Sequence, residues 1–129
     1  MMELTIKDIV YKFNFGMGFL KAINKEAKVE MDYSGNKKNM GLVYCVGGLL
    51  DKEVEDLAKV LEMANKGQNP RLTSKAIEDY IDNECEDIEA LFDTVLDFLE
   101  QSNACKLITK PLRENWEKDR MEAETETKK

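Results

Sequence analysis

The stretch that decides the fold runs from residue 77 to residue 99 and reads IEDYIDNECEDIEALFDTVLDFL. Its large apolar residues recur every three or four positions, the spacing that places side chains on one face of an α-helix. The positions of that face are Ile77, Tyr80, Ile81, Cys85, Ile88, Leu91, Phe92, Val95, Leu96 and Leu99. The period permits one long helix, or two helices broken near residues 83–86, with Asp87 capping the second.

This stretch also carries most of the charge of the chain. Residues 76–105 hold ten acidic and no basic residues, whereas the rest of the chain sums to +3, which gives the net charge of −7. The acids fall between the apolar positions, so we expect a solvated helix face. The block has no glycine for an EF-hand loop, and the chain has no histidine for a Glu-x-x-His metal site.

The composition excludes several classes of function. A chain of 129 residues with 43% apolar content predicts one domain with a core. The chain has no histidine, so we expect no enzyme activity, no metal site and no cofactor. Its three cysteines, Cys45, Cys85 and Cys105, lie far apart, which predicts buried thiols in a reducing cytosol. An acidic chain whose longest apolar run is residues 40–50 disfavours nucleic acid and membrane partners.

The residues before and after the acidic block complete the predicted architecture. Residues 3–15 alternate with period two, which indicates two short strands that turn near Lys7-Asp8, and a helical start is the alternative. The next segment predicts a helix whose apolar face carries Phe19, Leu20, Ile23 and Ala27, followed by a loop over residues 30–39. Residues 40–50 predict a buried helix or strand. Two further helices are predicted, one capped by Asp51 that stops at Gly67 and one capped by Thr73.

The C-terminal region differs from the rest in composition. Pro111 is expected to interrupt any helix that runs through Leu107 and Ile108, and residues 122–129 are expected to be disordered. The prediction is therefore a mainly α protein, a compact bundle of about five to six helices, with a short N-terminal β-hairpin as an option. Residues 1–110 would form the domain, and residues 111–129 a charged helix and tail.

So many amphipathic segments predict that an apolar groove is left open as the functional surface. Such grooves bind partner helices by anchors at i, i+3, i+4 and i+7. The candidate partner-binding residues are Leu49, Leu50, Leu91, Phe92, Val95, Leu99, Leu112 and Trp116.

Four stretches in this order resemble the tail assembly chaperones of long-tailed phages that infect Gram-positive bacteria. They are MELTI…YKFNFG (residues 2–16), GFLKAINK (18–25), SKAIEDYI (74–81) and DIEALFDTVL (87–96). Together with the glycine- and leucine-containing segment after Asn39, the resemblance covers about residues 2–105. It implies that residues 1–110 are a helical chaperone domain without catalytic residues.

The resemblance also implies a partner and a cellular location. The family binds the tape measure protein, a long helical chain that sets tail length, and keeps it soluble until the tail tube assembles. Its members commonly self-associate into homo-oligomers, act in the cytoplasm of the host bacterium and are not retained in the virion.

Two other functions are compatible with the sequence. The ten carboxylates of the acidic block could mimic nucleic acid in an inhibitor of a basic enzyme, whose binding would weaken with salt. A generic helical adaptor protein is the other alternative. An enzyme is the weakest interpretation, because it would require a carboxylate pair in a closed pocket and no motif indicates one.

Overall fold

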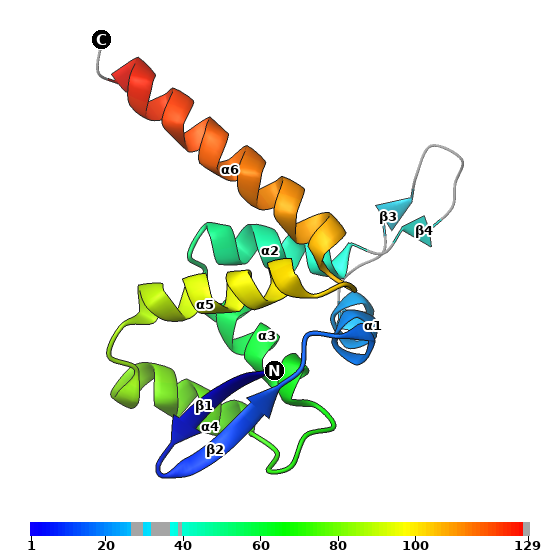
Figure 1. Ribbon diagram of the computed structural model, residues 1–129, viewed down its shortest axis with the longest axis vertical. Coiled ribbons are helices and arrows are strands. Elements are labelled where there is room, and N and C mark those ends of the chain that lie inside the picture. The colour runs from blue at the N-terminus through cyan, green and yellow to red at the C-terminus, as the bar shows by residue number, and fades with distance from the viewer. Residues whose placement is uncertain (27–29, 32–36, 39, 128–129) are drawn as a thin grey trace.

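A helical bundle and an N-terminal hairpin make up the computed structural model, which describes residues 1–26, 30–31, 37–38 and 40–127 (Figure 1). In chain order the elements are β1 (Met2–Ile6), β2 (Ile9–Phe13), α1 (Met17–Glu26), β3 (Glu30–Met31), β4 (Lys37–Lys38), α2 (Gly41–Leu50), α3 (Val54–Asn65), α4 (Ser74–Asp79), the π-helix η1 (Tyr80–Glu84), α5 (Ile88–Gln101) and α6 (Lys106–Thr127). The predicted mainly α bundle with a hairpin is confirmed.

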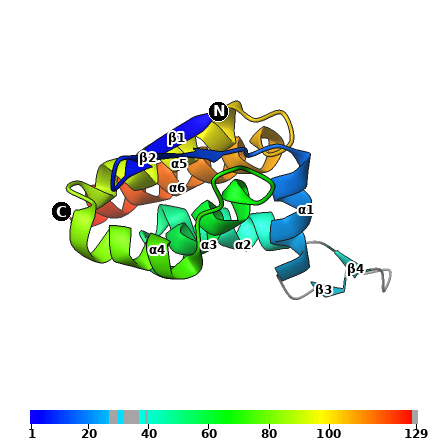
Figure 2. The same ribbon diagram turned by 90° about the horizontal axis from the view of Figure 1, so that it is seen from below.

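The hairpin of β1 and β2 lies across one side of the helices (Figure 2). Met2 pairs with Phe13 and Ile6 with Ile9, and Lys7 and Asp8 at the turn have φ of 50° and 67°. Positive φ at both central residues is the geometry of a type I′ turn, which matches the twist of paired strands. The strand prediction for residues 3–15 is therefore confirmed, and the alternative of a helical start is wrong.

A two-stranded hairpin is marginal in water and needs a surface to pack on. Met2, Ile6 and Phe13 supply a buried face. The Asn14 amide donates to the carbonyl of Ala64, at 2.8 Å, and so ties the hairpin to the end of α3.

Helices α1 and α2 approach each other closely. Phe19 and Ile23 bury one face of α1, as predicted, whereas Ala27 lies outside the described residues. A Cβ added at Gly41 would clash with the backbone of Ile23, so glycine is required where α2 begins. The Asn24 side-chain oxygen accepts from the Leu42 amide, at 3.1 Å, and thus caps α2 from the neighbouring helix.

The predicted loop over residues 30–39 is described in part. Glu30–Met31 and Lys37–Lys38 pair as two short antiparallel strands, and the remaining positions lie outside the described residues.

The turn between α2 and α3 differs from the prediction. Asp51 is not the cap of α3, because Lys52 has a φ of 62° and α3 starts after Glu53. The Lys52 amide donates to Leu49 O at 3.1 Å and the Glu53 amide to Gly48 O at 2.8 Å. These two bonds form a Schellman motif, so Asp51 belongs to the end of α2.

The acidic block forms two helical segments, as one of the two alternatives predicted. Thr73 caps α4 and Asp87 caps α5, each through its side-chain oxygen. The five residues of η1 continue α4 as a π-helix, and Cys85 is extended with a ψ of 112°, which ends that segment. Glu78, Asp82, Glu86, Glu89, Asp93 and Asp97 are exposed, which agrees with a solvated face.

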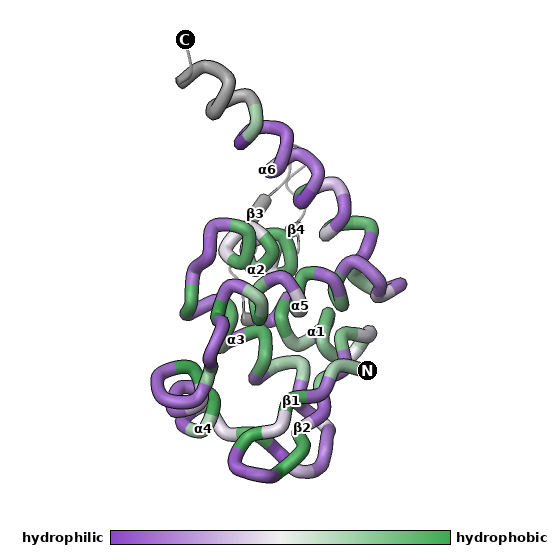
Figure 3. Tube along the Cα trace, turned by 60° about the vertical axis from the view of Figure 1, so that its left-hand side comes forward, coloured by the Kyte–Doolittle hydropathy of each residue, from purple (hydrophilic) through white to green (hydrophobic). Residues whose placement is uncertain are grey.

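Helix α6 contradicts the predicted break at Pro111. The helix is continuous from Lys106 to Thr127 with Pro111 inside it. Pro111 has no N–H to donate to the carbonyl of Leu107, four residues earlier. Both residues are exposed, so this carbonyl faces solvent. Residues 122–127, which fall in the predicted tail, are described as part of α6. This helix projects away from the bundle and is mostly hydrophilic (Figures 1 and 3).

Candidate partner-binding grooves

The described residues offer few reactive groups. Within them no cluster of three or more histidine, cysteine, aspartate or glutamate side chains is arranged to hold a metal ion. Cys45 and Cys105 are buried, as predicted, while Cys85 is half-buried. Burial raises the pKa of the Cys105 thiol, which keeps it protonated at neutral pH. In the same part of the chain no helix is long and apolar enough to cross a bilayer.

Six of the eight predicted partner-binding residues lie in the core. None of the six is more than 6% exposed: Leu49, Leu50, Leu91, Phe92, Val95 and Leu99. The other two, Leu112 and Trp116, are half-buried and pack against that core from α6. Of the eight, Leu112 and Trp116 are therefore the two with the most accessible side chains.

A groove runs between α3 and the pair α4–η1, and we call it the α3–α4 groove. It has a volume of about 630 Å³ and is lined by Val54, Glu55, Ala58, Lys59, Glu62, Met63, Ser74, Ile77, Glu78, Ile81 and Asp82. Val54 is 42% exposed, and Ala58 and Ile81 are half-buried. The floor is therefore apolar, and charged side chains border it.

The two walls of this groove are stripes of helical residues. The α3 residues of the lining recur every four positions from Val54, and those of α4 and η1 every three or four from Ser74. From Val54 to Met63 a helix rises about 14 Å. Two adjacent helices with an open apolar seam of this length can accept a third helix as in ordinary helix packing.

A second groove, which we call the Trp116 groove, lies between the α2–α3 turn, α5 and α6. It has a volume of about 490 Å³, and its lining includes Leu50, Lys52, Leu96, Arg113, Trp116 and Met121. The Trp116 indole donates to the Asp51 carboxylate at 3.3 Å, and the Arg120 guanidinium lies 5.4 Å from the Trp116 ring centre. The bond to Asp51 holds the indole against the bundle, whereas the Arg120 contact lies within α6.

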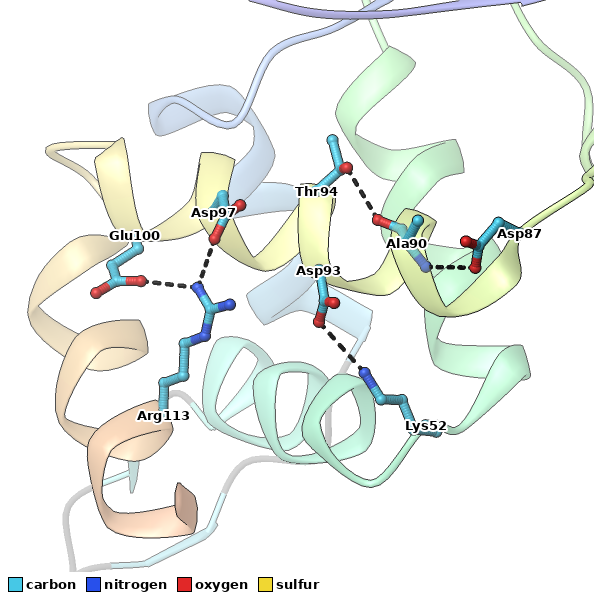
Figure 4. Close-up of polar contacts among 8 residues, drawn as sticks. All are labelled: Lys52, Asp87, Ala90, Asp93, Thr94, Asp97, Glu100 and Arg113. Carbon is cyan, nitrogen blue, oxygen red and sulfur yellow. Dashed lines mark hydrogen bonds and ion pairs between the residues drawn. The ribbon is translucent and has the colours of Figure 1, made fainter. Parts of the chain in front are cut away.

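Ion pairs join α5 to α6 and to the turn between α2 and α3, beside the Trp116 groove (Figure 4). Arg113 reaches Asp97 at 2.7 Å and Glu100 at 2.8 Å, and thereby fastens α6 to α5. Lys52 reaches Asp93 at 3.4 Å. Three carboxylates of α5 are thus paired with basic side chains on this side of the molecule.

Sequence reasoning missed the α3–α4 groove because it assigned the floor residues to the core. Val54 and Ala58 fall on the apolar stripe of α3, and Ile77 and Ile81 on that of the acidic block. Of the four only Ile77 is buried, since no other helix among the described residues lines this seam. The available signal was the row of acids beside both stripes, but periodicity alone does not show which stripe lacks a neighbour.

Comparison with known proteins gives one match. The family model described as "Phage tail assembly chaperone protein, TAC" matches residues 3–114, which is most of the chain. No curated protein and no solved structure matches.

Proposed function

Since the chain belongs to the phage tail assembly chaperone family, we propose that it binds the tape measure protein of its phage through an apolar groove. Family membership makes a phage tail protein the partner. In our proposal the chaperone keeps the helical tape measure chain soluble in the cytoplasm of the host bacterium until the tail tube assembles. It then leaves, and the mature virion does not retain it.

The observation that carries this proposal is the open apolar seam of the α3–α4 groove. Val54 and Ile81 leave apolar surface accessible between helical walls. A long amphipathic helix exposes a complementary stripe that would otherwise aggregate, and such stripes bind in grooves of this kind. Leu112 and Trp116 would add a second contact in the Trp116 groove.

Weak individual contacts suffice for a client with many similar helical segments. Several chaperone copies on one chain together bury about 1,000 Å² or more, and self-association into homo-oligomers adds avidity. Modest affinity at each groove also allows release when tail tube subunits compete. The exposed acids of α4 and α5 would keep the coated chain soluble through like-charge repulsion.

Co-expression with the tape measure protein of the same phage tests the proposal. The wild-type chain should bring the tape measure protein into the soluble fraction and elute with it. Val54→Asp should abolish this, because a carboxylate then lies in the apolar seam. Val10→Asp is the matched control, since Val10 is 45% exposed on β2, outside the groove.

The proposal fails if the tape measure protein stays insoluble with the wild-type chain, or if the two variants behave alike. Val54 is the first residue of α3, where aspartate is favourable for a helix, so Val54→Asp is expected to fold.

The structure favours the nucleic-acid mimic less. Four acids of the block, Asp79, Asp93, Asp97 and Glu100, form ion pairs with basic residues of this chain. A mimic needs its carboxylates free to meet a basic partner.

A further inference from the structure

The border of the α3–α4 groove is predominantly acidic. Its lining includes four carboxylates (Glu55, Glu62, Glu78 and Asp82) and one basic side chain, Lys59. Three of these carboxylates are exposed and Glu62 is half-buried. In the described part of the molecule none of the four forms an ion pair.

The Trp116 groove is different in this respect. Its lining holds three basic residues, Lys52, Arg113 and Arg120, and three acidic residues, Glu89, Asp93 and Glu117. Two of the bases are already paired with acids of α5. A charged partner would therefore gain little electrostatic attraction in the Trp116 groove, whereas the α3–α4 groove offers it unpaired acids on both walls.

The acids of the α3–α4 groove lie beside its apolar floor. A helix whose apolar stripe contacts this floor would place the residues next to that stripe close to the acids. Glu55 and Glu62 project from α3, and Glu78 and Asp82 from α4 and η1, so the apolar floor lies between two acidic walls. The π-helical turn of η1 contributes Ile81 and Asp82. Such turns occur often at functional sites, because they widen the helix and re-aim its side chains.

We infer that the α3–α4 groove selects amphipathic helices in which lysine or arginine flanks the apolar stripe on both sides. The inference rests on the proposed function, because it describes which segments of the tape measure protein this groove would hold. The apolar floor supplies affinity for about two and a half turns of helix, and the acidic walls supply the preference among segments.

Two designed peptides provide a direct test. Both are helices of about 18 residues with the same leucine stripe at i, i+3, i+4 and i+7, and one has lysine and the other glutamate beside the stripe. With the wild-type chain at about 0.15 M salt, the lysine peptide should bind about tenfold more tightly, as measured by fluorescence anisotropy.

Two double variants locate the preference. Glu78→Lys with Asp82→Lys should abolish or reverse it, whereas Glu89→Lys with Glu117→Lys should keep it. Both pairs change the net charge of the chain equally, but the second pair lies in the Trp116 groove. Circular dichroism should show that both double variants are folded.

Three results would overturn the inference. The first is equal binding of both peptides by the wild-type chain. The second is an equal loss of the preference in the two double variants, which would reveal an effect of net charge alone. The third is dissociation of a homo-oligomer by Glu78→Lys with Asp82→Lys in size-exclusion chromatography, in which case the groove holds a second copy of this chain.

The co-expression assay separates this inference from the proposed function. If Glu78→Lys with Asp82→Lys still solubilises the tape measure protein as the wild-type chain does, the acidic walls do not select its segments and this inference is wrong, while the proposed function stands. If the wild-type chain fails in co-expression but shows the charge preference with peptides, the proposed function is wrong and the groove chemistry stands.

Discussion

Helix α2 contains three glycines, which is unusual because each lowers helix stability by about 1 kcal/mol relative to alanine. Packing explains two of them. A Cβ at Gly41 would clash with the backbone of Ile23, and one at Gly48 with the side chain of Asp56. That close approach also buries part of the Asp56 carboxyl, and this burial raises its pKa. At Gly47 an added Cβ would meet nothing within 4 Å.

The glycines therefore predict opposite effects of the same substitution. Gly47→Ala should raise the free energy of unfolding by about 1 kcal/mol through helix propensity. Gly41→Ala should lower it by about 2 kcal/mol or more, because rigid backbone must move apart. Urea unfolding followed by circular dichroism measures both. Equal effects of the two substitutions would contradict the close approach of α1 and α2.

At the scale of elements, Asn65 joins segments that are distant in sequence. Its side chain is fully buried at the end of α3 and donates to Lys12 O at 3.0 Å and Pro70 O at 3.3 Å. Its oxygen accepts from Arg71 at 2.7 Å and from the Leu72 amide. One amide thus fixes β2 and the loop before α4, and so helps to set the position of α4 relative to α3.

Thr109 of α6 is a buried polar residue that differs from Asn65. Its hydroxyl has no hydrogen-bond partner in the described part of the molecule. Asn65→Leu should lower the free energy of unfolding by about 3 kcal/mol, because it leaves the buried Leu72 amide and the part-buried carbonyls of Lys12 and Pro70 without this partner. Thr109→Val removes an unpaired hydroxyl and should be neutral or stabilising by about 1 kcal/mol. Thermal and urea unfolding of both variants test this, and a stable Asn65→Leu variant would refute the role of the network.

The ends of the helices show what the sequence could predict about these elements. Local signals worked where one residue decides the geometry: Thr73 and Asp87 cap their helices, and Gly67 takes a φ of 82° in the turn that follows α3. They failed at Asp51 and Pro111. The start of α3 is set by the bonds that end α2, and Pro111 is tolerated because its side of α6 faces water.

The candidate site was harder to predict than the fold for a physical reason. Periodicity identifies apolar faces but does not show which of them a neighbouring helix covers. Leu49, Leu91 and Phe92 are covered, whereas Val54 and Ile81 remain accessible. Which stripe stays open depends on how the helices pack against one another, and a single sequence does not state this.

At the scale of the whole molecule, α6 consists of an attached part and a projecting part (Figure 1). Leu112 and Trp116 pack against the core, and Arg113 pairs with α5. Beyond them Met121 is 68% exposed. The predicted division after residue 110 falls inside this helix and separates the three attached residues from the bundle they contact.

Two truncated chains test how the attached part of α6 contributes to the fold. A chain of residues 1–121 should unfold at nearly the same urea concentration as the full chain. A chain of residues 1–110 should fold but lose about 3 kcal/mol of unfolding free energy, because it lacks two half-buried apolar side chains and the Arg113 pairs. If residues 1–110 were as stable as the full chain, the contacts of Leu112, Arg113 and Trp116 would contribute nothing to the fold, and α6 would be free to leave the bundle.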